Sequence, residues 1–396
     1  MRRGMFLLKL AYKNLVRAGL RTWLNALALS FGLVAIIGLQ GLYIGMGEQA
    51  ARVAKDAEYG GGQYWHKFYD PYDPLTLQDA HGKIPQNILK LISEGKATPI
   101  LIVQATAYPQ GRTVPVLLKG IIPEQKILKF PTEVLKNEDV DGIPALIGER
   151  MAAELGVKER DYLTVRWRDV NGTFDATDVK IVKIMSTTDQ NIDNGQIWVP
   201  LNVLQRLTGM EGEATIIVVS PDLKNPPPSP GFEFKNLKFL LKTIEALVKV
   251  KTQGSFVIYI ILLSIALISI FDSQVFSIFK RKKEIGTLMA LGFTRLQVII
   301  LFTLEGALHA FLAVILAALY GAPLLIYAAK VGWSLPKSAA ESFAIALGER
   351  LYPRYGTGLI VGTAILVFIV TTIVSYLPVR KIAKMKPTEA LRGGIQ

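Results

Sequence analysis

The chain has 396 residues, of which 51% are hydrophobic and 19% charged, and its mean hydropathy is +0.33. This is too apolar for an ordinary soluble protein, yet it leaves room for a water-facing domain. There is no cysteine, so a disulfide framework, a thiolate metal site and a cysteine nucleophile are excluded. His66, His81 and His309 lie far apart in the sequence, which gives a histidine-based metal site little support.

The net charge of +13 is unevenly distributed. Residues 48–253 carry 25 Lys and Arg against 26 Asp and Glu, whereas the remainder carries 20 cations against six acids. Most of these cations lie before Trp23, within 280–295 or after Leu377. This is the positive-inside pattern of a membrane protein, with Lys and Arg concentrated on the cytoplasmic side. A nucleic-acid patch would interleave basic and aromatic residues on one soluble surface, and no nucleic-acid partner is expected.

The N-terminal segment, residues 1–22, has the pattern of an amphipathic helix. Its apolar side chains fall near one side and its basic side chains near the other: Phe6, Leu7, Leu10 and Leu15 against Lys9, Lys13 and Arg17. This predicts a helix lying in the cytoplasmic interface of a membrane.

Residues 23–47 are uncharged and long enough to cross a bilayer, which needs about 20 residues. A cleaved signal peptide is the alternative, but the run is longer than the usual apolar core of about 7–15 residues. We therefore prefer an uncleaved first span. Within it, Gly41 and Gly45 have the G-x-x-x-G spacing that allows close helix packing.

Residues 48–253 indicate a large water-facing domain. Apolar runs of strand type, separated by Pro and Gly, recur at 100–107, 114–122, 162–167, 179–185, 196–199 and 214–219. Short helices fit 85–93, 148–155 and 201–208. We expect an α+β domain, part of it β-rich. No Ser/His/Asp or paired-carboxylate signature stands out, so no catalytic, cofactor or metal site is expected.

Two further features of this domain lie near its ends. Aromatic residues cluster just after the first span, where they could face lipid headgroups or an amphiphilic substrate, or simply pack at the base of the domain: Tyr59, Tyr64, Trp65, Phe68, Tyr69 and Tyr72. The proline-rich stretch 226–230 predicts a stiff, extended linker. Apolar residues at helical spacing then predict a stalk helix, 235–253, that runs into the second span.

The second and third spans, 254–279 and 296–329, contain ionisable residues. Asp272 lies in the second span, where a carboxylate is costly and suggests either a proton relay or a polar contact between helices. Glu305 and His309 in the third span are four residues apart and share one helix face. They could form a relay or a metal pair, or a hydrogen-bonded pair buried against another helix.

The C-terminal part returns to the outside and crosses once more. Residues 330–355 predict an external loop with an amphipathic helix around 339–351. Residues 356–378 predict the fourth span, in which Gly358 and Gly362 repeat the small-residue spacing and Pro378 marks the end. The basic residues of 379–396 predict a cytoplasmic tail.

Residues 280–295, KRKKEIGTLMALGFTR, join the second and third spans. Four consecutive cations would stay in the cytoplasm. A short amphipathic helix follows, with Ile285, Leu288 and Met289 near one face and Gly292 as its stop. Such a helix could dock a soluble partner and pass force to both spans; the alternative is a solvated loop that only fixes topology.

Four sets of residues together resemble one family. Arg281, Glu284-Ile285-Gly286, Leu288 and Ala290-Leu291-Gly292 are similar to the R-x-x-EIG-x-L-x-ALG signature of MacB/LolC/LolE/FtsX-type ABC transporter permeases. The opening LAYKNL (10–15) with Arg17 and Arg21-Thr22, and the closing PVRKIA (378–383) with KPTEALR (386–392), resemble the family's termini. Gly148-Glu149, Ala152, Leu155-Gly156-Val157 and Asp161 resemble its external-domain motif.

The resemblance implies an α-helical membrane protein with four transmembrane helices and a large α+β extracytoplasmic domain inserted between the first two. It implies a multi-pass protein of the inner, or cytoplasmic, membrane with both termini in the cytoplasm. The partners implied are a cytoplasmic ABC ATPase, a second permease chain in a homo- or heterodimer, the bilayer, and a periplasmic acceptor or adaptor protein. The residues that would couple to the ATPase are Arg281, Lys283, Glu284, Ile285, Gly286, Leu288, Met289, Leu291 and Gly292.

Three functions are weighed on this basis. The first is a permease subunit, without its own ATPase site, that moves a lipoprotein, lipid or other amphiphile by mechanotransmission. No G-x-x-x-x-G-K-[ST] phosphate loop occurs in the sequence, so a partner would hydrolyse ATP. The second is a non-transporting mechanical transmitter that regulates a cell-wall hydrolase. The third, a membrane-anchored enzyme, is the least supported.

Overall fold

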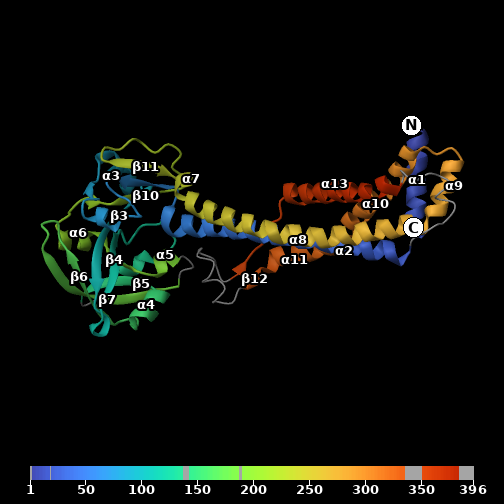
Figure 1. Ribbon diagram of the computed structural model, residues 1–396. Helices are drawn as coiled ribbons and strands as arrows, with labels where there is room; N and C mark the ends of the chain where they lie inside the picture. Colours follow the sequence, from blue (N-terminus) through green and yellow to red (C-terminus); the bar gives the residue numbers. More distant parts are fainter. Residues whose placement is uncertain (1, 18, 137–141, 187–189, 335–349, 383–396) are drawn as a thin grey trace. The chain divides into compact units, whose positions relative to one another are not determined.

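A computed structural model describes residues 2–17, 19–136, 142–186, 190–334 and 350–382 (Figure 1). The chain divides into two compact units. The membrane unit comprises 1–46, 247–333 and 351–396, and the large domain comprises 47–246 and 334–350. The membrane unit is built from long helices and the large domain around a mixed sheet.

The helices of the membrane unit follow the apolar runs of the sequence. They are α1 (Arg2–Arg17), α2 (Leu20–Ala54), α8 (Lys242–Lys280), α9 (Lys282–Ala290), α10 (Arg295–Leu316), α11 (Ala322–Val331) and α13 (Thr357–Ile382), with a π-helical segment η5 (Ala317–Gly321) between α10 and α11. Within the described residues, four segments are long and apolar enough to cross a membrane: Thr22–Tyr59, Lys242–Lys280, Arg295–Val331 and Thr357–Arg380. With the large domain between the first two, the predicted fold class is confirmed.

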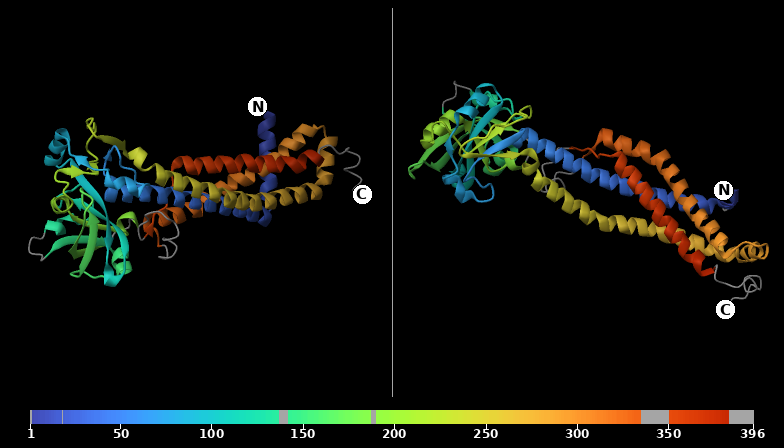
Figure 2. Two further views of the ribbon diagram at one scale, coloured as in Figure 1. Left: turned by 60° about the vertical axis from the view of Figure 1, so that its left-hand side comes forward. Right: turned by 90° about the horizontal axis from the view of Figure 1, so that it is seen from above.

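The spans meet along a core of aliphatic and small side chains. Leu29 and Leu33 of α2, Ile270 of α8 and Ala310 of α10 are among its buried members. Figures 1 and 2 show α13 lying along α10. Large apolar side chains on the outer face of α8, such as Phe256 and Ile265, are exposed, as expected of helices that face hydrocarbon.

The large domain contains a nine-stranded sheet of order β11-β1-β10-β3-β4-β8-β5-β7-β6. The strands are β1 (Gly62–His66), β3 (Ala97–Ala107), β4 (Val114–Ile121), β5 (Ile143–Gly148), β6 (Tyr162–Arg168), β7 (Phe174–Met185), β8 (Gln196–Pro200), β10 (Ile216–Val219) and β11 (Phe232–Asn236). The first half of β3 pairs with β10 and its last three residues pair with β6. The pairing of β3 with β6 closes the strands β3-β4-β8-β5-β7-β6, in sheet order, into a barrel around one apolar core.

The remaining elements of the domain are short. They are β2 (Gly82–Lys83) paired with β9 (Glu213–Ala214), β12 (Trp333–Ser334), β13 (Arg350–Leu351), α3 (Gln86–Ser93), α4 (Glu149–Leu155), α5 (Gln190–Asp193), α6 (Leu201–Thr208), α7 (Leu237–Leu240), η1 (Lys55–Tyr59), η2 (Pro74–Gln78), η3 (Pro109–Gly111) and η4 (Thr132–Lys136). Strands β1, β5 and β11 are absent from the sequence-based prediction, because none of them has an uninterrupted apolar run: β1 and β11 contain polar residues, and β5 contains Pro144.

The structure corrects two predicted boundaries. The stalk helix does not begin at 235: strand β11 extends to Asn236 and α8 begins at Lys242. Helix α13 does not end at Pro378, which lies inside it. The predicted helix at 339–351 lies outside the described residues, apart from the strand residues 350–351, and the tail from 383 onward also lies outside them.

The aromatic residues after the first span are partly explained by packing. Tyr64 is fully buried, its ring meets Phe234 edge-on, and its hydroxyl donates a hydrogen bond to the carbonyl of Pro227 at 2.7 Å. Burial raises the pKa of Tyr64 to about 12, so the hydroxyl stays protonated and able to donate. The packing interpretation is confirmed for Tyr64, which also anchors the proline-rich stretch; Phe68 and Tyr72 are exposed.

The external-domain motif that begins at Gly148 has a structural explanation. A Cβ at Gly148 would collide with the backbone and carboxylate of Asp193. That carboxylate is buried and lies 3.3 Å from the Arg150 guanidinium. It accepts hydrogen bonds from the backbone N–H groups of Glu149 and Arg150. Gly156 ends α4 with a φ of +70°, where glycine is favoured. The motif therefore fixes the start and end of one short helix.

Candidate functional site at the α8–α10 hairpin

Helix α9 is a short amphipathic helix between α8 and α10, and both views of Figure 2 show it joining their ends. It ends at Ala290 and is followed by a turn in which Gly292 has a φ of +94°; the capping box of Thr294 and Gln297 then starts α10. Ile285 is buried together with Val298 and Phe302 of α10, and Met289 packs beside them. The opposite face is open to solvent, with Lys283, Glu284, Thr287 and Leu291 exposed.

A buried polar network fastens the start of α9 to α10. Arg281, at the N-cap of α9, donates from Nη1 to both carboxylate oxygens of Glu305 at 3.0 and 3.1 Å. Its Nε donates to Glu284 Oε2 at 2.8 Å. From α1, Asn14 Nδ2 donates to Glu305 Oε1 at 2.6 Å. We call these four residues the Arg281 network; it links α1, the α8–α9 junction and α10.

The surroundings of the network make these bonds strong. The Glu305 side chain is 7% exposed and that of Arg281 19%. The guanidinium lies over the Phe302 ring, 4.9 Å from its centroid, and this ring is fully buried. Burial lowers the pKa of Arg281, but the facing carboxylates more than offset this, so its pKa lies above the ordinary value and the charge is kept. Charge-assisted bonds out of water hold their partners in one geometry.

Helix α1 is attached to the same place by apolar packing. Leu7 and Ala11 are buried together with Leu301 of α10. Phe6, which the sequence pattern placed on the apolar side, is 57% exposed. The buried face of α1 therefore runs through Leu7, Ala11 and Leu15, with Asn14 half-buried beside them, and α1 packs against a transmembrane helix.

The structure separates the ionisable residues that the sequence singled out. His309 does share a helix face with Glu305, but its Nδ1 lies 2.8 Å from the Glu305 backbone carbonyl, and the carboxylate is bound by Arg281 and Asn14. Asp272 is exposed on α8 beside a hydrogen bond from Asn25 Nδ2 to Ser273 Oγ at 2.6 Å. In the described part of the chain, no cluster of three or more His, Asp or Glu residues could hold a metal ion.

The predicted packing glycines have different surroundings. A Cβ at Gly41 would collide with the Tyr355 ring, and one at Gly45 with the Tyr352 carbonyl, so both admit the segment before α13 rather than another helix. Among the residues that the structure describes, no atom lies within 4 Å of a Cβ at Gly358 or Gly362. The close crossing of α10 and α13 is instead at Gly306, where a Cβ would meet Ser375, a contact that the sequence analysis missed.

Sequence reasoning also missed the polar network itself. Arg281 and Glu305 were both singled out, but 24 residues separate them, and Asn14 lies a further 267 residues upstream of Arg281. The available signal was that Glu305 is an ionisable residue inside an apolar helix and that Arg281 directly follows another apolar helix. Such groups need partners, and those at the same membrane depth are the natural choice.

Together, these features define a membrane protein with four spans, a large α/β domain between the first two and an amphipathic helix between the second and third. Residues 256–387 match the family model described as FtsX-like permease C-terminal. This segment, which includes α9, α10 and the Arg281 network except Asn14, is similar to an FtsX-like permease domain, and the resemblance noted in the sequence is confirmed there.

Two further comparisons extend beyond this segment. Over 233 residues the chain is 28% identical to an uncharacterised ABC transporter permease of Methanocaldococcus jannaschii, a match that covers 54% of this chain and 55% of that protein. The chain thus spans about half the length of this relative. The crystal structure of the extracellular domain of the noncanonic ABC-type transporter YknZ from Gram-positive bacteria aligns with 41% of this chain and 84% of its own, at 13% identity. Its TM-score is 0.25.

Proposed function

We propose that this chain is the membrane subunit of an ABC transporter and that a separate cytoplasmic ATPase docks on α9. The observation that carries the proposal is the division of α9 into two faces. One face is fixed to α10 by Ile285 and the Arg281 network, and the other presents Lys283 and Leu291 to solvent. Leu291 is 76% exposed at the tip of the hairpin, where an apolar contact with a soluble partner would bury it.

The network supports mechanical coupling rather than simple anchoring. A push on α9 would reach α10 through Arg281 and Glu305, and α1 through Asn14. It would also reach α8, a single helix of 39 residues, which is about 58 Å long at 1.5 Å per residue. A continuous helix of that length transmits a displacement from one end to the other.

The finer features of the proposal rest on the motif resemblance and the charge pattern. We place the chain in the cell inner membrane with both termini and α9 in the cytoplasm, because the cations concentrate there. We propose that a second permease chain completes the transporter and that the cargo is a lipoprotein, lipid or other amphiphile. A periplasmic acceptor or adaptor protein would receive it.

The docking proposal is tested with variants of the open face that leave the network intact. Lys283→Glu and Leu291→Glu should each lower the ATPase activity that copurifies with the tagged chain from native membranes at least tenfold. Lys9→Glu, the same change at an exposed position of α1, is the control and should not. Equal copurifying activity in all three variants would contradict docking on α9, and so would its absence from the wild type.

A further inference from the structure

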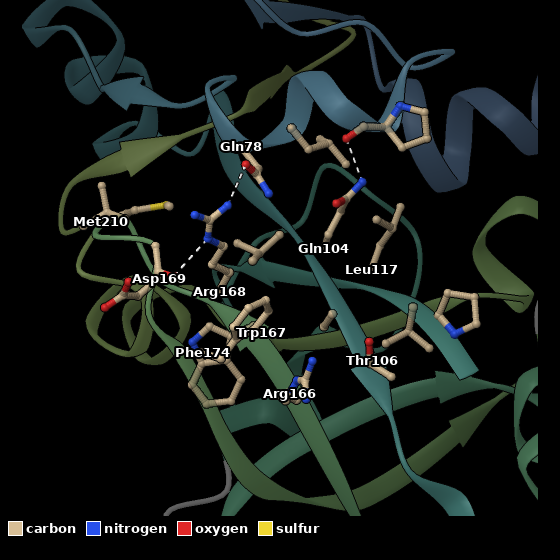
Figure 3. A pocket seen from close by; sticks show the side chains of 18 of the residues that line it. Gln78, Gln104, Thr106, Leu117, Arg166, Trp167, Arg168, Asp169, Phe174 and Met210 are labelled. Carbon is tan, nitrogen blue, oxygen red and sulfur yellow. Dashed lines mark hydrogen bonds between the residues drawn. The ribbon is translucent and has the colours of Figure 1, made fainter. Parts of the chain in front are cut away.

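The outer surface of the barrel in the large domain carries a groove of about 840 Å³. This volume falls within the range of about 300–1,000 Å³ typical of small-molecule sites. The floor is strand β3, with β4 on one side and β6 and the turn 169–172 on the other (Figure 3). Helix η2, whose last residue is Gln78, closes one end of the groove. The groove belongs to the large domain alone and is remote in sequence from the Arg281 network.

The strand register explains which side chains meet there. Strand β6 alternates strictly, so Val165 and Trp167 are buried in the barrel while Arg166 and Arg168 point outward. Thr106 of β3 pairs with Arg166, so these two outward side chains are cross-strand neighbours. Two apolar flanks lie across the adjacent strands. On β4, Thr106 pairs with Pro115 and Gln104 with Leu117; on β7, Arg168 pairs with Phe174.

The two guanidinium groups are the main charges in the groove. Arg168 donates from Nε to the Gly172 carbonyl at 3.0 Å and from Nη1 to Gln78 Oε1 at 3.2 Å, both uncharged partners. Arg166 lies over the Phe174 ring, 4.6 Å from its centroid. Among the residues that the structure describes, neither guanidinium is in an ion pair. Their unused N–H groups and their positive charge therefore remain available.

Two carboxylates also line the groove and must be weighed against the arginines. Asp169 accepts hydrogen bonds from the backbone N–H groups of Asn171 and Thr173, at 2.9 and 2.7 Å, so it stabilises its own turn. Asp79 is exposed at the edge of the groove and, within the described residues, forms no ion pair with either arginine. The centre of the groove, at Arg166, Arg168 and Thr106, thus presents donors to a ligand, and Phe174 presents a 63% exposed ring beside them.

We propose that this groove binds an organic anion whose phosphate or carboxylate is held by Arg166 and Arg168 and whose apolar part lies against Phe174. Arginine pairs suit such oxyanions because each guanidinium offers several N–H donors in a planar fork. The Thr106 hydroxyl is placed to donate one more bond. Binding at this groove requires no ATPase, so a test of it is independent of whether an ATPase docks on α9.

The test is calorimetric titration of the full-length chain in uncharged maltoside micelles. Two probes carry the proposed chemistry from different sources: phenyl phosphate as a soluble organic anion and dihexanoyl phosphatidic acid as a lipid headgroup. At least one should bind ten times more tightly than inorganic phosphate, because only the organic probes contact the apolar flank. Which of the two binds identifies the source. Dihexanoylglycerol, which lacks the anion, should not bind.

Variants assign the binding to the groove. Arg166→Gln should raise the dissociation constant of the probe at least tenfold, because a hydrogen bond to a charged group is lost. Arg206→Gln, at an exposed position of α6 outside the groove, should leave affinity unchanged. If Arg166→Gln does not fold, Thr106→Val provides a second test and should lower the affinity for the probe by a smaller factor. Absence of binding by both probes, unchanged affinity in Arg166→Gln, or equally tight dihexanoylglycerol would overturn the proposal.

Discussion

Replacing Arg281 by methionine should leave the Glu305 carboxylate buried, with the Asn14 amide as its remaining partner in the network. Removing one member of a buried ion pair lowers the free energy of unfolding by about 3–5 kcal/mol, because the other charge is left uncompensated. Since Arg281 is 19% exposed and Asn14 still donates, we expect a loss at or just below the lower end of that range, about 2–3 kcal/mol. Glu305→Leu should cost about 2 kcal/mol, because Arg281 keeps the exposed Glu284 as a partner.

The double variant distinguishes an ion pair from two independent contacts. Replacing both members by apolar side chains of similar size removes both buried charges, and such replacements are often neutral. We therefore expect the double variant Arg281→Met/Glu305→Leu to lose only about 1 kcal/mol, with an interaction energy of about 3–4 kcal/mol between the two sites.

The measurement is the free energy of unfolding of the membrane helices in an SDS titration followed by helical circular dichroism. Lys280→Met, at the neighbouring exposed position, is the matched control and should change stability by less than about 0.5 kcal/mol. Additive losses in the double variant, or single losses as small as that of the control, would refute the view that a buried ion pair fixes α9.

Other positions give equally specific expectations. Gly306→Leu should lower the stability of the helices by about 1–3 kcal/mol through overpacking, whereas Gly358→Leu, in open space, should be neutral in the same titration. Burial raises the pKa of Asp193 above its ordinary value of 3.8, so the folded domain binds this proton more tightly and the residue adds stability as pH falls toward 3.8. The difference in stability between Asp193→Asn and the wild type should therefore be smallest near pH 7 and should grow on acidification, as the wild type gains stability. A difference in unfolding midpoint that does not change with pH would contradict this. Because the chain lacks cysteine, Lys283→Cys and Lys224→Cys should be labelled by an impermeant maleimide from opposite sides of the membrane, and labelling from the same side would refute the topology.

The elements that sequence reasoning predicted are those with a long periodic pattern. The four spans follow from apolar length, and most of β6 follows from the strand-type run 162–167; that its two arginines share the outer face is seen only in the structure. Strands β1 and β5 were missed because short strands inside a mixed sheet are specified by their neighbours.

The site was predictable only in part. The amphipathic pattern and the motif located α9, but no local pattern could pair Arg281 with Glu305 or bring Asn14 to them, because those contacts depend on how three helices cross. The same holds for Gly306: its four-residue spacing to Ala310 is common in apolar helices, and only the contact with Ser375 distinguishes it.

The way α9 is attached suggests how stability and coupling can be separated. Apolar contacts such as Ile285 against Phe302 are not directional, so by themselves they would let α9 slide along α10. The two bonds from Arg281 to Glu305 are directional and resist that movement. The double variant Arg281→Met/Glu305→Leu keeps and extends the apolar contact but loses the directional bonds.

We therefore expect the double variant to fold and retain its bound ATPase, yet to lose most of the coupling between nucleotide and the large domain. The measurement is the nucleotide-dependent change in protease sensitivity at 226–230 in the purified complex, with Lys280→Met as control. A double variant that responds to ATP as the wild type does would show that the apolar face of α9 transmits the force without the ion pair.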